Sequence, residues 1–290
     1  MNNETPVHVP WQAGAAPPRQ AWHWQGGLSA AYASEAGCSH VLNEDCCSHF
    51  PSAERPGFCG VADGVGGGAH GEIASRVLLA HCAQAPWETY SDPVGLADLL
   101  ARADTEVRAA IARRTDQVGA ATLAAAWFPS QSTAYVLHVG DCRAYQLQAR
   151  KGGYAIVQLT QDQTYASFAQ QPPPNARPED PARMVGAGAV GSPPVVKAHM
   201  RQRDLLLLCS DGVHKFVSNG EIAELVGRGR DGGSSLAAIC DSLVQAAKRN
   251  GSQDDASALL VLRRPWFTPR WAYACAIALA VLLLLGWLWA

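Results

Sequence analysis

The feature that most constrains this chain is a series of short apolar runs that begin or end at an aspartate. The runs include FCGVAD and LLLLCSD, and the acids are Asp63, Asp141, Asp162, Asp211, Asp254 and Asp255. An ionised carboxylate is costly to bury unless it is paired or bound to a metal. Solvated turns explain any one of these acids, because Asp is a common turn residue, but they explain the set poorly. The pattern therefore predicts acids gathered at one end of a layered sheet structure.

The same runs predict the elements of the domain. Residues 27–34 and 58–63 are typical of strands, as are ATLAAAWF, TAYVLHVG, RAYQLQ, YAIVQLT, DLLLLCS and ASALLVL. Helical spacing predicts helices that begin near His70 and that span 94–116, 219–227 and 234–249. The segment 170–182 has five prolines and is expected to be an exposed loop. Strands and helix pairs come in blocks, which favours an α+β domain with mixed or antiparallel sheets.

Composition excludes several classes of protein. The 290 residues suffice for one large domain or two smaller ones, and the formal net charge of -2 comes without a basic block. Nucleic-acid binding is therefore not expected. The nine cysteines are scattered without a C-x-x-C motif, which argues against a zinc ribbon or a thioredoxin site. Several lie in apolar runs, as buried free cysteines do, and indicate a reducing compartment.

The two ends of the chain differ from its centre. Residues 1–20 lack a secretory signal and are expected to form a flexible arm. The run 271–290, WAYACAIALAVLLLLGWLWA, carries no charge and has aromatic residues near both ends. As a helix it would span roughly 30 Å, the thickness of a hydrocarbon core. The basic linker 264–270 precedes it, so the prediction is a single-pass helix of the inner or plasma membrane with the preceding domain in the cytoplasm. The alternative is a buried C-terminal core helix.

The stretch VADGVGGGAH places Asp63 before a cluster of glycines. An ordinary turn would use such glycines, whereas a P-loop would need a Lys-Ser/Thr pair that is missing here. A third interpretation is a metal bound by Asp63 at a strand end, with glycines that let backbone and ligand approach closely. His and Cys do not recur at ligand spacing, so clustered carboxylates favour Mg²⁺ or Mn²⁺ over zinc. Asp63 would bridge two ions about 3.5–4 Å apart, and the Gly64 carbonyl would complete one shell.

Six motifs in order resemble those of the metal-dependent protein phosphatases of type 2C, in their compact bacterial form. The second resembles Asp-Gly-x-Gly-Gly followed by Gly-Glu-x-Ala-Ser, and the fifth is close to Leu-Leu-x-Ser-Asp-Gly. The motifs are SEAGCSHVLNED (34–45), VADGVGGGAHGEIAS (61–75), VGDCRAYQL (139–147), LTQDQTY (159–165), LLLLCSDGV (205–213) and NGSQDDASALLV (250–261). The resemblance covers about residues 25–263.

This resemblance implies a four-layer α-β-β-α sandwich with two central, mainly antiparallel sheets over residues 21–263 and a flap at about 163–190. It implies two Mn²⁺ or Mg²⁺ ions, with a weaker third, and direct attack of metal-bound water on phosphoserine or phosphothreonine. It assigns as ligands of the two main ions Asp63, Asp211, Asp254 and, through its carbonyl, Gly64. Asp141, together with Asp211, would bind the third ion. Glu44 and Asp45 would hold metal-bound waters.

The chain also departs from the family pattern. His40 stands where the family has an Arg that grips the substrate phosphate, and Val65 where many eukaryotic members have a His. Asp255 replaces Asn, Ser257 replaces Thr, and MVGAGAVG (184–191) fits its motif only loosely. None of these changes removes a primary metal ligand. An active phosphatase is therefore predicted, with phosphorylated proteins as substrates and a Ser/Thr kinase as its opposing partner.

Three alternatives stay open. A pseudophosphatase would bind phosphopeptides as a regulator without useful turnover. A sporulation or stress-response regulator would carry out the same chemistry on an anti-sigma antagonist. The phosphate could also be bound by Arg143 or Arg183 rather than by His40, whose shorter side chain offers fewer donors than an arginine.

Overall fold

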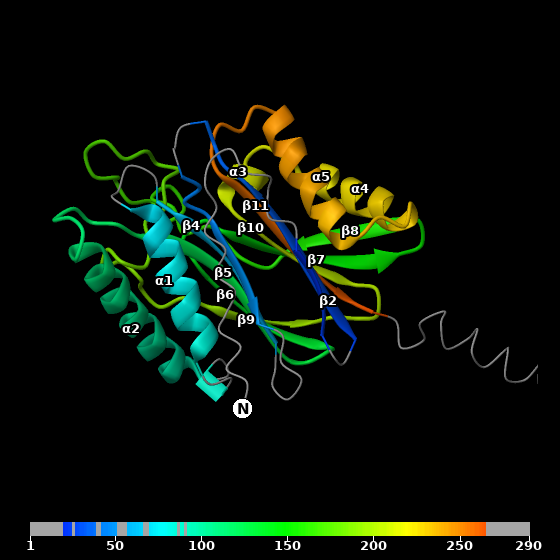
Figure 1. The fold of residues 1–290 in the computed structure, drawn as a ribbon, viewed down its shortest axis with the longest axis horizontal. Helices are drawn as coiled ribbons and strands as arrows, with labels where there is room; N and C mark the ends of the chain where they lie inside the picture. The colour runs from blue at the N-terminus through cyan, green and yellow to red at the C-terminus, as the bar shows by residue number, and fades with distance from the viewer. Residues whose placement is uncertain are drawn as a thin grey trace, which may run out of the picture.

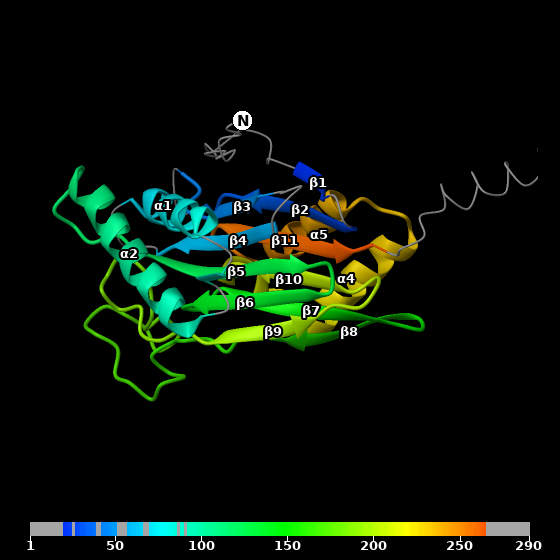
Figure 2. The same cartoon turned by 90° about the horizontal axis from the view of Figure 1, so that it is seen from below.

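Two antiparallel sheets packed face to face form the centre of the molecule. The structure, a computed structural model, describes residues 20–24, 27–38, 42–50, 57–65, 70–85, 88–89 and 92–264. Figures 1 and 2 show a helical layer on the outer face of each sheet. The predicted α+β sandwich of four layers with two central antiparallel sheets is confirmed.

The predicted helix over 271–290 lies outside the described residues, together with residues 1–19 of the predicted arm and 265–270 of the linker. None of the helices in the described ranges combines the length and apolar character needed to cross a membrane. The membrane helix stays a prediction from the sequence.

The first sheet has six strands in the order β1-β2-β11-β10-β7-β8. Their bounds are β1 (Gln20–Trp24), β2 (Leu28–Glu35), β11 (Ala256–Arg263), β10 (Leu205–Cys209), β7 (Arg143–Arg150) and β8 (Gly153–Gln158). The two central strands, β10 and β11, are almost continuously apolar and buried, as expected for strands covered on both faces.

The second sheet has five strands in the order β3-β4-β5-β6-β9, which Figure 2 shows side by side. Their bounds are β3 (Cys46–Phe50), β4 (Gly57–Gly64), β5 (Ala121–Ser130), β6 (Thr133–Val139) and β9 (Val195–His199). Every neighbouring pair in this sheet is antiparallel. The ends of β4 and β6 and the start of β5 therefore lie at the same end of the sheet.

Two groups of helices cover the sheets (Figure 1). The helices α1 (Gly71–Gln84) and α2 (Pro93–Ala112) pack on the second sheet. The first sheet is covered by α3 (Asp211–His214), α4 (Asn219–Asp231) and α5 (Leu236–Arg249). Asp92, Ser218 and Ser235 cap the starts of α2, α4 and α5 by accepting hydrogen bonds from backbone N–H groups of the first turn.

The core has three parts because side chains alternate across each strand. On β10, Leu206 and Leu208 point between the two sheets, where they pack with residues such as Val61 and Ala124 of the second sheet. Leu205 and Leu207 point to the other side, against α4 and α5. A third cluster lies between the second sheet and the helices α1 and α2.

Among the elements of the described residues, three strands and one helix were not predicted. The strands β1, β3 and β9 all lie at the edges of their sheets. An edge strand needs fewer apolar residues, and β9, VVKAH, is mostly exposed or half-buried, so its sequence carries little periodic signal. The helix α3 has four residues, too few to show helical spacing. The helix predicted over 94–116 ends at Ala112.

The long loop between β8 and β9 projects from one end of the sandwich (Figure 2). It contains turns and isolated bridges rather than regular elements, among them Thr164 with Pro181 and Ala121 with Val185. The second bridge ties the loop to the start of β5. The exposed loop predicted at 170–182 forms part of this segment.

The intersheet core generates a stability prediction. Leu206→Ala should lower the free energy of unfolding by about 2–5 kcal/mol, because it leaves a cavity between two sheets that cannot both relax. Val157→Ala on β8, where the side chain is exposed, should change it by about 0.5 kcal/mol or less. Urea unfolding followed by circular dichroism measures both. Similar losses in the two variants would contradict the assigned core.

Candidate functional site

A cleft of about 530 Å³ opens at the end of the sheets where β4, β6 and β10 end. One wall of the cleft carries acids that lie next to the ends of four different strands, and the other is formed by the loop between β8 and β9. The acids are Asp63, Asp141, Asp211 and Asp254, and Gly64 lines the cleft beside them. The structure therefore brings together all five residues that the sequence assigned to metal ligation, although their role as ligands stays a prediction.

Strand direction explains why these acids meet. Asp63 is the penultimate residue of β4, Asp141 follows β6, and Asp211 begins α3 directly after β10. Asp254 precedes β11, which runs antiparallel to β10, so the start of β11 lies beside the end of β10. Acids far apart in the chain thus reach one end of the sandwich.

A glycine follows both Asp63 and Asp211 because the backbone is crowded there. A Cβ atom on Gly64 would lie 2.5 Å from the backbone carbonyl carbon of Gly71, at the start of α1. On Gly212 it would lie 1.9 Å from the carbonyl oxygen of Asp255. Each glycine allows a close approach that no other residue permits. This requirement is separate from the coordination by the Gly64 carbonyl that the sequence suggested.

Glu44 and Asp45 lie behind the lining of the cleft, on the segment before β3. The carbonyl oxygen of Glu44 accepts hydrogen bonds from Gly64 N at 3.2 Å and Ser75 Oγ at 2.7 Å. Ser210 Oγ donates to Asp45 Oδ2 at 2.7 Å, and Asp45 Oδ1 is buried without a hydrogen-bond partner. The segment is thereby attached both to the end of β4 and to the start of α3.

Asp255 is the residue that fixes this segment. Its carboxylate accepts hydrogen bonds from Gly37 N and Glu44 N, each at 2.6 Å, and its side chain is buried. From the sequence, Asp255 was one of the acids expected to gather and a departure from the family's Asn. The structure shows it as a positioning acid, which joins the segment of Glu44 and Asp45 to the start of β11.

Lys215 is a cleft residue that the sequence analysis missed. Its Nζ atom lies 2.7 Å from Asp211 Oδ2 and 3.3 Å from Asp141 Oδ2. The spacing of four residues between Asp211 and Lys215 was the available signal, since residues at i and i+4 are neighbours on a helix. It was hard to use because α3 itself could not be predicted.

His214 holds the backbone next to this ion pair. Burial lowers the pKa of His214 to about 4, so its imidazole is neutral near pH 7. Its Nε2 atom lies 2.8 Å from the carbonyl oxygen of Asp141, which can only accept, and therefore carries the proton. His214, the last residue of α3, and Lys215, which follows it, thus both contact Asp141.

Neither of the two predicted alternative phosphate-binding arginines lines the cleft. Arg143 makes two hydrogen bonds of 2.7 Å to the carboxylate of Asp162. Arg143 begins β7 beside the end of β10, so Asp162 lies at the same end of the sheets as the gathered acids. It is neutralised by this arginine and does not line the cleft. Arg183 lies over the ring of Phe168, 5.2 Å from its centre, in a separate hollow of about 700 Å³. His40 lies outside the described residues.

The gathered acids strongly perturb each other. Burial raises the pKa of Asp63 well above its usual value, and the charges of Asp45, Asp211 and Asp141 raise it further. Burial and the charge of Asp211 raise the pKa of Asp141 to about 7, against the opposing effect of Lys215. Burial also acts to raise the pKa of Asp211, but the ammonium of Lys215 outweighs it and the pKa is lowered. The cleft is therefore a place where added positive charge stabilises the folded chain.

These residues fit hard divalent cations in chemistry and in location. Carboxylates and a backbone carbonyl are the donors that Mg²⁺ and Mn²⁺ prefer. Asp211 Oδ1 is buried without a hydrogen-bond partner, which is typical of an oxygen that coordinates a metal ion. As the side chains stand, no three His, Cys, Asp or Glu residues in the described ranges form a closed ligand set. The fit therefore rests on the donors that share one cleft.

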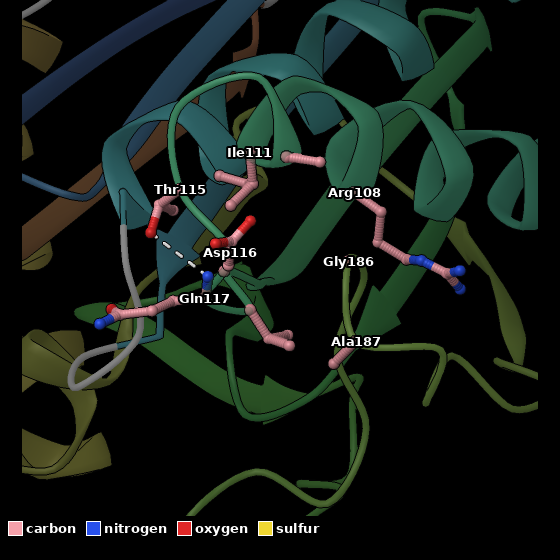
Figure 3. Close-up of a pocket in the computed structure, with 10 residues that line it drawn as sticks. Arg108, Ile111, Thr115, Asp116, Gln117, Gly186 and Ala187 are labelled. Carbon is pink, nitrogen blue, oxygen red and sulfur yellow. Dashed lines mark hydrogen bonds between the residues drawn. The ribbon is translucent and has the colours of Figure 1, made fainter.

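Another hollow, of about 470 Å³, lies at the C-terminal end of α2 (Figure 3). It is lined by Thr115, Asp116 and Gln117 on one side and by Gly186 and Ala187 of the long loop on the other. Asp116 is the acid in its lining, so this hollow lacks the concentration of carboxylates that marks the cleft.

Comparison with known proteins agrees with the geometry. Residues 38–260 match the family model described as protein phosphatase 2C. A serine/threonine protein phosphatase of Mycobacterium tuberculosis, PstP, is 28% identical over 247 residues, which cover 80% of this chain and 44% of PstP. The chain thus spans less than half the length of that relative. A serine/threonine phosphatase of Listeria monocytogenes, Stp, is 25% identical over 250 residues, 81% of this chain and 96% of Stp.

Solved structures have the same fold. Stp1 of Staphylococcus aureus matches with a TM-score of 0.69 at 22% identity, over 84% of this chain and 99% of its own. PppA is described as a regulatory component of the type VI secretion system of Pseudomonas aeruginosa. It matches with a TM-score of 0.65 at 25% identity, over 84% of this chain and 99% of its own. The catalytic domain of PstP in complex with two manganese ions matches with a TM-score of 0.63 at 26% identity, over 82% of this chain and 99% of its own. With most of the chain matched by the family model, this protein belongs to the protein phosphatase 2C family.

Proposed function

We propose that the chain hydrolyses phosphoserine and phosphothreonine in proteins, with two Mn²⁺ or Mg²⁺ ions bound in the cleft. The observation that carries this proposal is that four carboxylates, each next to the end of a different strand, line one wall of the cleft. Relatives named serine/threonine phosphatases and a similar structure that holds two manganese ions support it. The opposing partner would be a Ser/Thr kinase.

In this proposal the carboxylates of Asp63, Asp211 and Asp254 and the carbonyl of Gly64 hold the two ions. When bound, such ions lower the pKa of a water molecule and offset the charge of the phosphoryl group. Glu44 and Asp45 hold and orient water from behind the cleft. Asp255 keeps them in position, because its carboxylate accepts hydrogen bonds from the backbone N–H groups of Gly37 and of Glu44 itself.

The long loop supplies the remaining wall of the cleft and would contact the protein substrate. Its lining residues include Tyr165, Asn175, Asp180 and Met184. An aromatic ring, an amide and an acid at the mouth of the cleft would meet the peptide that carries the phosphate. We propose that differences in substrate preference arise from this loop rather than from the acids.

We also propose that residues 271–290 anchor the chain in the inner or plasma membrane, with the phosphatase domain in the cytoplasm. The support is the uncharged run of 20 residues and the arginines Arg263, Arg264 and Arg270 on its N-terminal side.

Asp63→Asn should reduce Mn²⁺-dependent hydrolysis of para-nitrophenyl phosphate and of a phosphothreonine peptide by about 100-fold or more, because one charge and one ion contact are lost. Asp116→Asn, in the separate hollow, is the matched control and should keep the activity. Near-normal turnover by Asp63→Asn would contradict the proposed site. Tight phosphopeptide binding without turnover by the unmodified chain would favour the pseudophosphatase instead.

Metal removal should make stability depend on pH. The raised pKa values of Asp63 and Asp141 mean that the metal-free folded chain holds protons more strongly than the unfolded chain. These two acids therefore contribute stability that is fully present below the ordinary aspartate pKa and is lost as the pH rises through about 7, the pKa of Asp141. Thermal unfolding in EDTA should give a lower Tm at about pH 8 than at about pH 5, and Mn²⁺ should raise Tm more at the higher pH.

The control for this measurement is Asp141→Asn, which should weaken the pH dependence of the metal-free Tm. A metal-free Tm that is equal or higher at the higher pH would contradict the proposed repulsion between the ionised carboxylates in the folded chain.

Membrane attachment is tested by fractionation. The full chain should stay in the membrane pellet after a carbonate wash and enter solution with detergent, because an apolar helix of this length is held by the hydrocarbon core. A chain that lacks residues 266–290 should be found in the soluble fraction with its phosphatase activity intact. Release of the full chain by carbonate alone would contradict the anchor.

A further inference from the structure

An ammonium group already occupies the space between two of the cleft acids. Lys215 Nζ lies 2.7 Å from Asp211 Oδ2 and 3.3 Å from Asp141 Oδ2. We propose that Lys215 is a built-in cation that takes the place of a divalent ion between these two carboxylates, so that the cleft binds two divalent ions and not a third. This inference rests on the proposed function, because it concerns the ions of the same site.

The burial of the two acids explains why a cation is needed there. The side chain of Asp141 is 3% exposed and that of Asp211 is 16% exposed. Two carboxylates this close and this poorly hydrated need a positive partner. A lysine ammonium has three donors, enough to serve both acids at once. Within the described part of the lining of the cleft, Lys215 is the residue with a positively charged side chain.

The backbone of α3 holds the ammonium in this position. Asp211 begins the helix, and Lys215 N donates to the carbonyl oxygen of Asp211 at 3.0 Å, so both side chains leave the same face. His214, the residue before Lys215, binds the carbonyl oxygen of Asp141 at 2.8 Å. The loop of Asp141 is therefore attached to α3 by a neutral contact and by an ion pair.

The ammonium divides the acids of the cleft into two groups. Asp211 uses Oδ2 for Lys215, whereas its Oδ1 atom is buried without a hydrogen-bond partner. The second oxygen thus stays available for an ion shared with Asp63. A divalent ion at Asp141 would have to displace the ammonium or lie beside it, and the repulsion of like charges opposes the second arrangement.

Counting bound Mn²⁺ on the purified full chain tests this inference without any measurement of activity. Equilibrium dialysis with elemental analysis should give two ions for the unmodified chain. Lys215→Met should bind one additional, weaker ion, because it exposes the carboxylate pair. Lys215→Arg keeps the charge and should bind two. Lys151→Met, which removes an exposed lysine from the turn between β7 and β8, is the matched control for net charge and should also bind two.

A second substitution identifies where the additional ion binds. Asp141→Asn alone should leave two ions, because Asp141 holds the lysine and not a metal. In the Lys215→Met background, Asp141→Asn should remove the additional ion and restore two. Lys215 is 38% exposed, so its replacement should be tolerated, and Lys215→Gln provides a second variant if Lys215→Met does not give a cooperative thermal transition.

The outcomes separate this inference from the function on which it rests. Three ions on the unmodified chain, or no gain of an ion in Lys215→Met and Lys215→Gln, would overturn the role of Lys215 and leave the phosphatase proposal standing. An unmodified chain that binds no Mn²⁺ would overturn both.

Discussion

The repulsion between poorly hydrated carboxylates at one end of the sandwich is the constraint on which the rest of the structure depends. Asp63, Asp141 and Asp211 come from both sheets, and each raises the energy of a charge on its neighbours. A chain does not gather such groups unless something offsets their charge. The surrounding scaffold holds these acids together, and the proposed divalent ions would offset their charge.

That scaffold is made of backbone contacts rather than of further charges. Gly64 and Gly212 let the start of α1 and the carbonyl of Asp255 approach the acids, and Asp255 in turn holds the segment of Glu44 and Asp45 through backbone N–H groups. Because Asp255 is buried and fully engaged, it positions residues of the site without lining the cleft. The intersheet core keeps the two sheets in register beneath this network.

Among the described residues that line the cleft, Lys215 carries the positive charge. The family resemblance implies a phosphate-binding arginine at the position of His40, and neither Arg143 nor Arg183 lines the cleft. The cation that does line it, Lys215, faces carboxylates. In the proposed site, the lysine neutralises part of the carboxylate charge that a divalent ion would otherwise neutralise.

The sequence by itself determined the central strands, the larger helices, the layered α+β class and the acids that meet in the cleft. These features follow from continuous apolar runs such as LLLLC and from the aspartates at their ends, which are local signals. Only the tertiary structure decided that Asp162 is neutralised by Arg143, that Asp255 holds Glu44, and that Lys215 lies between Asp141 and Asp211. It also decided the edge strands β1, β3 and β9. The physical reason is that pairing partners and edge positions are set by contacts between residues far apart in the chain, which no local pattern of apolar residues encodes.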